Sequence, residues 1–481
     1  MSRKGSILIA LVVLILSGQA QSSTYYTAKT SATAPLDMTL ASTWTTALPT
    51  SATAGQFITA APATTYFLSA DWSCGDWAVG YASPTFDLGA GKTWNVVSAA
   101  NGNGSGIGWY DGGSYVSTVT LKSGTMAFSG TDPILIGYGA ERVAGSREHN
   151  FIIDGGTVNI NGTNAGGTSN AGCITVQRAG MLWLKAGSTM NIASTSRLRV
   201  GTDQGNLAYG GLARIDGILN VDGKISVGDY RPNGTLQVGG TINLTATSGN
   251  QFAGGSQGAG LEPGARFLLT GGSIIATNHQ ALACVNSTSD ATNPGILMGT
   301  GVIDNVDVNF NTGTAGRFKI APGVDSLTTG TIELRNASLN EGSGQSVAMK
   351  LGVTSADKLL ISTALKSATI ANGITFSALG DLTMATGSYD LVVAPAITYG
   401  GTALSTIGSD VPAVTGDNLV TLLTGLGYTR VTGTAPTAGQ FRYYVADAGS
   451  SLKSIRVEFA PEPATMALLA FGGMTLLRRR K

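Results

Sequence analysis

The sequence has few charged side chains. Only 12% of its 481 residues are Asp, Glu, Lys or Arg, about half of the usual fraction. Such a chain cannot carry the salt-bridged surface of a helical cytosolic enzyme, so its surface must consist mostly of Ser, Thr, Asn and Gly. Six positive charges lie at the two ends, at Arg3, Lys4 and 478–481, and without them 23 basic residues face 28 acidic ones. This mildly acidic body gives no electrostatic case for nucleic-acid binding.

Cysteine and histidine are scarcer still. The three cysteines, Cys74, Cys173 and Cys284, are about 100 residues apart, and an odd, sparse set is not a disulfide framework. We therefore expect buried thiols, with a single disulfide as the alternative. His149 and His279 each stand alone, outside any metal-binding motif, which indicates surface or turn positions. The sequence thus assigns no catalytic, cofactor-binding or metal-binding residue.

Glycine, by contrast, is abundant. The chain has 68 glycines together with many Thr and Ser residues. Turns use Gly or Asn, and strands favour β-branched side chains, so this composition is typical of repetitive β-structure.

The N-terminus has the three parts of a secretory signal peptide. Arg3 and Lys4 precede an unbroken apolar run over residues 7–16, and small residues follow it. The run is shorter than the roughly 20 residues that a stable transmembrane helix needs. We predict a signal peptide over residues 1–20, export by the Sec machinery and cleavage between Ala20 and Gln21.

A short strand pattern recurs along the body of the chain. Apolar residues spaced by two, the strand period, form pairs that repeat every eight residues: Ile174/Val176, Leu182/Leu184, Met190/Ile192 and Leu198/Val200. A second similarity relates residues 217–227 to residues 234–244 with an offset of 17. Internal repetition of this kind is typical of repeat architectures.

Two architectures explain short strands at this pitch, an antiparallel meander and a solenoid. Hairpins would need positive φ at nearly every corner, and corners such as 193–196 lack both Gly and Asn. Three units of eight give a coil of about 24 residues, within the range of β-solenoids. We predict an all-β protein, a right-handed β-solenoid (β-helix) with a C-terminal β cap or small sandwich, in which strands near 441–447 and 454–459 pair in antiparallel fashion.

The predicted organisation has five segments. The signal peptide covers 1–20, a Ser/Thr/Ala-rich lead-in covers 21–63, solenoid repeats cover 64–345, the C-terminal β cap covers 346–460, and a hydrophobic terminal helix lies within 461–481. The lead-in is either loosely ordered or a first capping strand.

The C-terminal end of the sequence resembles a known sorting signal. Pro461-Glu462-Pro463, an apolar stretch over 464–477 and the basic cluster Arg478-Arg479-Arg480 resemble, in this order, the PEP-CTERM tail. The resemblance implies recognition by an exosortase, cleavage near the Pro-Glu-Pro motif, and an envelope that contains exopolysaccharide. Physically, the apolar stretch enters the membrane transiently while the arginines stay on the cytoplasmic side.

The repeats also resemble those of autotransporter passenger domains. The elements that carry this resemblance are Ala321-Pro322-Gly323, then Gly330-Thr331-Ile332, and the segment over 355–362. A true autotransporter ends in an outer-membrane barrel, whereas this chain ends in the sorting tail.

A few residues could carry chemistry on a solenoid. Stacked carboxylates could serve a polysaccharide lyase or glycosidase, or bind calcium, and the candidates are Asp216, Asp222 and Asp229, or Asp304 and Asp307. Asp216 and Asp222 precede glycine, which favours a turn role. The tryptophans Trp72, Trp77, Trp94 and Trp109 could stack on sugars or be buried in an N-terminal cap.

We therefore expect an exported, non-enzymatic surface or matrix protein without a cofactor. Rows of exposed Thr, Ser and Asn are compatible with weak contact to exopolysaccharide or with packing against copies of itself. A carbohydrate-active enzyme and an adhesin remain the alternatives.

Overall fold

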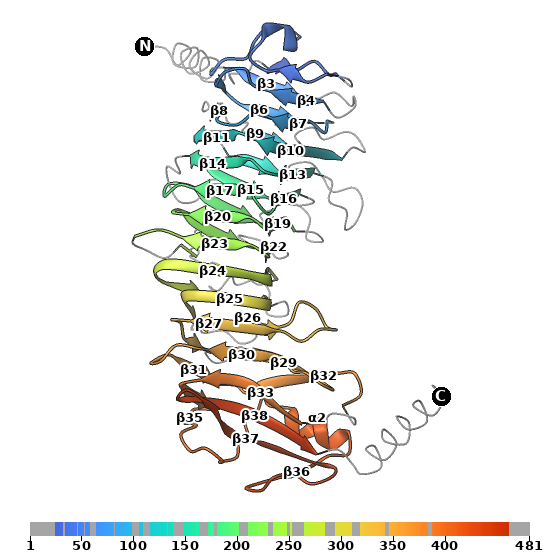
Figure 1. The fold of residues 1–481 in the computed structure, drawn as a ribbon, viewed down its shortest axis with the longest axis vertical. Helices are drawn as coiled ribbons and strands as arrows, with labels where there is room; N and C mark the ends of the chain where they lie inside the picture. Colours follow the sequence, from blue (N-terminus) through green and yellow to red (C-terminus); the bar gives the residue numbers. More distant parts are fainter. Residues whose placement is uncertain are drawn as a thin grey trace, which may run out of the picture.

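The protein is a column of stacked coils made almost entirely of short strands (Figure 1). The computed structural model describes residues 25–31, 34–45, 47–51, 53–57, 64–80, 82–98, 105–108, 116–131, 133–137, 149–162, 172–177, 180–201, 210–228, 234–247, 251–252, 264–283, 294–309, 318–341, 346–382 and 387–460. The predicted signal peptide, the cleavage site at Ala20 and Gln21, and the predicted terminal helix lie outside these residues. The chain begins at one end of the column and reaches the other end in sequence order.

One face of the column is a ladder of parallel strands that runs from the N-terminal end to the middle. It contains β1 (Tyr25–Thr27), β3 (Ala54–Phe57), β6 (Trp77–Val79), β9 (Ser105–Ile107), β12 (Ile134–Ile136), β15 (Cys173–Val176), β18 (Arg197–Val200) and β21 (Lys224–Val227).

A second ladder of parallel strands follows the whole column. It contains β2 (Leu36–Asp37), β4 (Thr65–Phe67), β7 (Thr85–Asp87), β10 (Ser117–Ser123), β13 (His149–Ile153), β16 (Gly180–Leu184), β19 (Leu212–Ile215), β22 (Thr235–Val238), β24 (Arg266–Ala283), β25 (Gly295–Asn309), β26 (Phe318–Pro322), β29 (Ser346–Gly352) and β32 (Ile374–Leu379).

The third ladder lies beside it and shares the long strands β24 and β25. It contains β5 (Trp72–Cys74), β8 (Thr93–Ser98), β11 (Thr125–Gly130), β14 (Thr157–Gly162), β17 (Thr189–Ile192), β20 (Ile218–Val221), β23 (Thr241–Leu244), β27 (Thr331–Arg335), β30 (Lys358–Ile361) and β33 (Gly387–Ala394). Beyond β25, the strands β28 (Leu339–Asn340), β31 (Ser367–Ile370) and β34 (Ala396–Tyr399) complete each coil. The pairing confirms the predicted β-solenoid.

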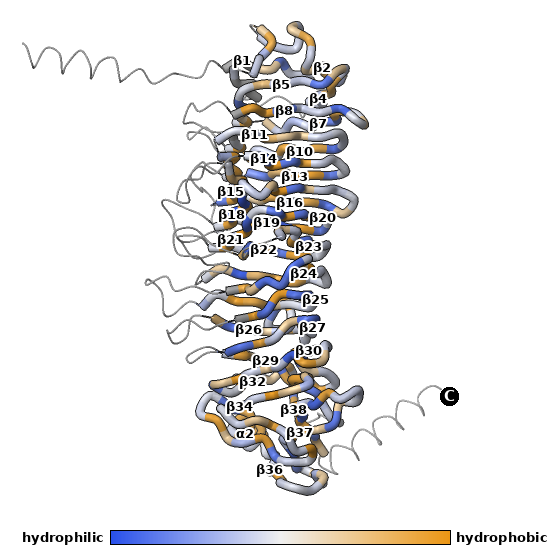
Figure 2. Tube along the Cα trace, turned by 90° about the vertical axis from the view of Figure 1, so that its left-hand side faces the viewer, coloured by the Kyte–Doolittle hydropathy of each residue, from blue (hydrophilic) through white to orange (hydrophobic). Residues whose placement is uncertain are grey.

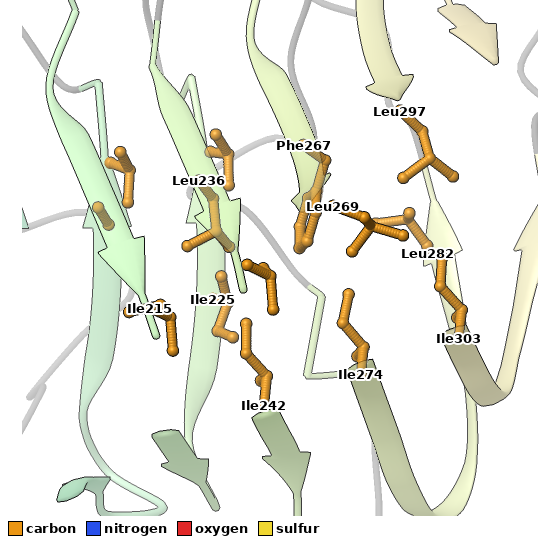
Figure 3. Close-up of a cluster of buried hydrophobic side chains, with 14 of the residues drawn as sticks. Ile215, Ile225, Leu236, Ile242, Phe267, Leu269, Ile274, Leu282, Leu297 and Ile303 are labelled. Carbon is orange, nitrogen blue, oxygen red and sulfur yellow. The ribbon is translucent and has the colours of Figure 1, made fainter. Parts of the chain in front are cut away.

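The eight-residue pattern corresponds to the strands β15, β16, β17 and β18. Strand β18 pairs in parallel with β15, so that Leu198 lies opposite Ile174 and three units of the pattern make one coil, as predicted. The alternate side chains of each strand point inward, and coil upon coil they form continuous buried columns. Figure 3 shows one stretch of this core, where Ile242, Ile274 and Ile303 follow one another along the third ladder.

The second similarity, with its offset of 17 residues, does not correspond to the length of one coil. Leu219 and Leu236, which it relates, lie on different ladders, and the register partner of Leu219 in the next coil is Ile242. The offset is therefore not the coil length: it relates each strand to the next strand but one along the chain, β20 to β22 and β21 to β23. The shared glycines have a steric reason, because a Cβ on Gly240 would collide with the carbonyl oxygen of Gly217 in the neighbouring coil.

Corners without glycine are closed by hydroxyl groups. At the corner over 193–196, the backbone N–H of Ser196 donates to the carbonyl of Ala193 at 2.8 Å. The hydroxyls of Thr195 and Ser196 donate to the carbonyl of Gly162 in the preceding coil, at 2.7 and 2.8 Å. These side chains therefore fix the corner to the preceding coil, and no residue of the corner has a positive φ.

The N-terminal end has an aromatic core. Trp72, Trp77 and Trp94 are at most 7% exposed, and the Trp72 and Trp94 rings stack with their centroids 5.6 Å apart. Trp44 packs against Trp72 from the loop that contains the 3-10 helix η1 (Ala41–Thr43). Burial of these rings fits the expected capping role. The alternative that they stack on sugars is wrong for the three tryptophans that the structure describes, and Trp109 lies outside the described residues.

The lead-in over 21–63 supplies β1, β2 and β3 to the first coils.

The C-terminal end is closed by antiparallel strands, as expected. Strand β38 (Leu452–Ala460) pairs with β37 (Gln440–Gly449) and with β33, while β35 (Thr402–Ala403), β36 (Thr429–Val431) and helix α2 (Leu419–Gly425) lie around them. The parallel ladders continue to β34, so the solenoid extends beyond the boundary placed at 345/346. A buried hydrogen bond joins cap to coil, since the Tyr399 hydroxyl donates to the Asp417 carboxylate at 2.5 Å.

A buried ion pair fixes the coil that contains the autotransporter-like elements. The ammonium of Lys350 lies 2.9 Å from the carboxylate of Asp357 and also donates to the carbonyl of Pro322. The same carboxylate accepts the backbone N–H groups of Gly330 and Lys350, at 2.9 and 2.8 Å. Burial raises the pKa of Asp357 even though these donors favour its ionised form. One carboxylate thus joins three separate segments of the chain.

Removing this carboxylate is expected to loosen the coil locally. Asp357→Ala leaves the Lys350 ammonium buried without its partner, which costs about 3–5 kcal/mol. Amide hydrogen exchange of peptides from residues 318–361 measures this loss for the segment itself. The control is Arg335→Ala, which removes an exposed ion pair with Glu333 and is expected to leave the exchange of this segment nearly unchanged, because solvent screens the pair. Equal effects of the two substitutions would contradict the role given to Asp357.

Candidate functional site

The first candidate acid is neutralised by its neighbours. One carboxylate oxygen of Asp216 accepts hydrogen bonds from Arg214 Nε at 2.7 Å and from Trp183 Nε1 at 2.8 Å. The Arg214 guanidinium also lies over the Trp183 ring, 4.5 Å from its centroid. This cluster could not be predicted from the sequence, because Trp183 and Asp216 meet only when the neighbouring coils that carry them are stacked in register.

The other acids of this group do not join it. Asp222 lies at an exposed corner on the third ladder, and its backbone N–H donates to the carbonyl of Ile192. Asp229 lies outside the described residues. The structure therefore does not bring Asp216 and Asp222 together as a pair of carboxylates on one face.

Asp304 and Asp307 each bind groups of neighbouring coils. Asp304 accepts a hydrogen bond from the Asn336 side chain at 3.0 Å. Asp307 accepts the backbone N–H of Ser338 at 2.7 Å, and its second oxygen lies 2.8 Å from His279 Nε2. Both acids thus connect coils. Among the described residues, no group of three or more His, Cys, Asp and Glu side chains is placed to hold a metal ion.

His279 is a surface residue, as expected, with 46% of its side chain exposed, and its ring contacts two side chains of the next coil. Its Nδ1 faces the side-chain oxygen of Asn305 at 3.0 Å, and the Asn305 amide nitrogen donates to the carbonyl of Ala276, which fixes the orientation of the amide. Both ring nitrogens therefore face acceptors, and only the protonated imidazolium can donate to both. Hydrogen bonds from Asp307 and then Asn305 raise the pKa of His279. Each ring nitrogen is thus engaged in a contact to the next coil.

The remaining singled-out residues are structural. His149 is the first residue of β13 and is 8% exposed, so its assignment to a surface or turn position is wrong. Its ring fills the space above Gly108, where a Cβ would lie 2.6 Å from it. Cys74 and Cys173 are buried thiols, as expected, and Cys284 lies outside the described residues.

From β8 to the second part of β24, the third ladder presents an uncharged outer surface, which we call the Thr/Asn face. It consists of the outward side chains at two positions of β8, β11, β14, β17, β20, β23 and the second part of β24. The first row contains Thr93, Thr125, Thr157, Thr189, Ile218, Thr241 and Ser273, and the second contains Asn95, Ala127, Asn159, Asn191, Asn220, Asn243 and Ile275. These side chains are half-buried, except for Ile218 and Ile275, which are 46% and 41% exposed.

Within the second row the amides form a hydrogen-bonded ladder. Asn191 donates to Asn159 at 2.8 Å, Asn220 donates to Asn191 at 2.8 Å, and Asn243 donates to Asn220 at 2.9 Å. The three bonds have the same direction, so Asn191 and Asn220, which both donate and accept, are each held in one orientation.

The second ladder has a different outer surface. Its outward positions include Trp183, Leu268 and Met298 beside the charged Lys185 and Arg214. In Figure 2 hydrophobic and hydrophilic stretches both occur along the coils of the stack, as expected for strands with one buried face. The two ladders thus differ in chemistry although they share one backbone plan.

The candidate sorting segment begins where the cap ends. Ala460 is still paired with Gln440, and its carbonyl accepts the N–H of Gly439 at 2.9 Å. Pro461 follows at once, and proline has no N–H with which to extend the ladder. Pro461, Glu462, Pro463 and Arg478 to Arg480 lie outside the described residues. In the part of the chain that the structure describes, no helix is long and apolar enough to span a bilayer.

The His279 contacts predict a pH dependence. A pKa raised above the ordinary 6.5 means that this contact stabilises the fold fully below about pH 6.5 and is lost as the pH rises through the folded value. Titration of the two histidine rings by NMR, with His149→Gln for assignment, is expected to give a pKa for His279 above 6.5, lowered by Asp307→Asn. The control Asp222→Asn removes an exposed carboxylate elsewhere. A His279 pKa at or below 6.5 in the unmodified protein would contradict this geometry.

Comparison with known proteins identifies the C-terminal segment. The model of the PEP-CTERM protein-sorting motif matches residues 460–481. No curated protein and no solved structure gave a match to the chain. The matched segment starts at the last residue of β38 and contains the Pro-Glu-Pro motif, the apolar stretch and the arginines. The chain therefore carries a PEP-CTERM sorting motif behind a β-solenoid, and this motif implies an exported surface protein that an exosortase processes.

Proposed function

We propose that the protein is a non-enzymatic structural component of the cell surface or extracellular matrix that associates with exopolysaccharide. The sorting motif at 460–481 carries this proposal, because it directs an otherwise self-contained column to the envelope. We also propose export by the Sec machinery with cleavage between Ala20 and Gln21, and only transient contact of the terminal segments with the membrane.

The surroundings of the candidate acids support a structural role. Glycoside hydrolysis needs two carboxylates about 5 to 10 Å apart, one of which must be able to release or accept a proton. Asp216 is bound by a guanidinium and an indole, and Asp307 by the His279 ring and a backbone N–H. These partners connect neighbouring coils, so the acids contribute to the stability of the column.

The position of the tail supports its processing. Strand β38 is paired on both sides, by β33 and β37, and it ends at Ala460. A rigid cap directly before the Pro-Glu-Pro motif separates the folded column from the segment that an exosortase cleaves. Cleavage there would leave the solenoid and its cap intact.

Processing can be tested with variants of the motif. In a host that contains an exosortase, we expect the unmodified protein to lose the segment that follows Ala460 and to appear at the surface or in the medium. Replacement of Pro461, Glu462 and Pro463 by Ala is expected to leave the tail attached and the protein in the membrane fraction. Cell fractionation and the mass of the mature C-terminus measure both effects.

The matched control is Glu458→Ala, which removes a carboxylate within the cap and should be processed normally. An intact tail on a cytoplasmic protein would contradict the proposal. Release of reducing ends from exopolysaccharide by the purified protein would contradict the non-enzymatic role.

A further inference from the structure

We infer that the Thr/Asn face is a docking surface for a neutral, hydroxyl-rich polysaccharide chain that lies along the column axis. This inference rests on the proposed association with exopolysaccharide and names the surface and the class of polymer.

The absence of charge selects the ligand class. From Thr93 to Ile275, neither row of the face contains an ionisable side chain among the described residues. An acidic polysaccharide or a nucleic acid would need cations to compensate its charge. Hydroxyls and amides that both donate and accept hydrogen bonds suit a polymer of neutral sugars.

The order of the face lowers the cost of binding. The Asn159 to Asn243 ladder fixes the amides before any ligand arrives, so little side-chain entropy is lost on contact. Equivalent groups recur at the strand spacing of about 4.8 Å. Because one hydrogen bond contributes only about 1 kcal/mol, a long repeating polymer gains affinity by making many such contacts.

The size of the face argues against a second copy as the occupant. Six steps between strands give a length of about 29 Å, and the two rows are about 7 Å apart, so the surface covers on the order of 200 Å². Stable protein–protein interfaces bury about 800 Å² on each partner. A narrow, uncharged strip of this kind fits a single extended polymer chain better.

Binding to insoluble polysaccharide tests the inference. We expect the purified protein to co-sediment with regenerated cellulose, as a neutral probe, and not with calcium alginate, as an acidic one. Thr157→Lys/Thr189→Lys places two ammonium groups on the face and is expected to weaken binding to cellulose roughly tenfold, or about 1.4 kcal/mol. The matched control Thr120→Lys/Thr235→Lys adds the same charge to the second ladder and should bind like the unmodified protein.

A second double variant, with smaller substitutions, keeps the test valid if the introduced lysines disturb folding. Thr157→Val/Thr189→Val removes only the hydroxyls and is expected to weaken binding by a smaller factor, while Thr120→Val/Thr235→Val should not. Equal binding by the face variants and their controls would overturn the inference, and so would preferential binding to alginate. A dimer seen by sedimentation velocity and lost in Thr157→Lys/Thr189→Lys would assign the face to a second copy and overturn it as well.

Failure here is separable from failure of the proposed function. If the face variants bind cellulose normally while the protein is processed and held in the matrix, the Thr/Asn face is not the docking surface. The proposed function is then unaffected. If the unmodified protein binds no polysaccharide and is not exported, the proposed function itself fails.

Discussion

The structure depends on parallel backbone hydrogen bonding between neighbouring coils in a constant register. Side chains alternate between the two surfaces of a strand, so a slip of one residue would turn a column of Ile, Leu and Val outward. In the core, the constant register places Leu219 between Met190 of the preceding coil and Ile242 of the next. On the outer surface, it places Asn220 between Asn191 and Asn243. The dry core and the outer amide ladder are therefore two results of one constraint.

The same constraint explains where the polar residues are found. Groups that would be isolated along the sequence meet across coils: Trp183 with Asp216, His279 with Asp307, and Lys350 with Pro322. These contacts fix one coil to the next and leave the Thr/Asn face free of charge. The two ends differ, with tryptophans closing the first coils and antiparallel strands closing the last. The sorting segment follows directly from the closed end.

The fold could be predicted where coils are short and regular. The apolar pairs from Ile174 to Val200 fall on four successive strands, and their spacing gives the correct coil of three units. Elsewhere connections of unequal length separate the strands, so coil lengths differ, and the boundary placed at 345/346 fell within the solenoid. The partners of Asp216 and His279 could not be predicted, since they depend on those lengths. The sorting tail could be predicted from the sequence, because its motif is contiguous and does not depend on how the coils stack.

Disulfide trapping between neighbouring coils tests the register most directly. Register partners on parallel strands have Cα atoms about 4.8 Å apart, within the range that a disulfide spans, whereas positions two residues out of register are about 8 Å apart. In the stacked register, Thr189 lies opposite Ile218, so Thr189→Cys/Ile218→Cys is predicted to form a cross-link under mild oxidation. Thr189→Cys/Asn220→Cys is predicted to form none. Peptide mapping identifies the cross-link. Cross-linking of the second pair and not the first would contradict the stacked register on which the account depends.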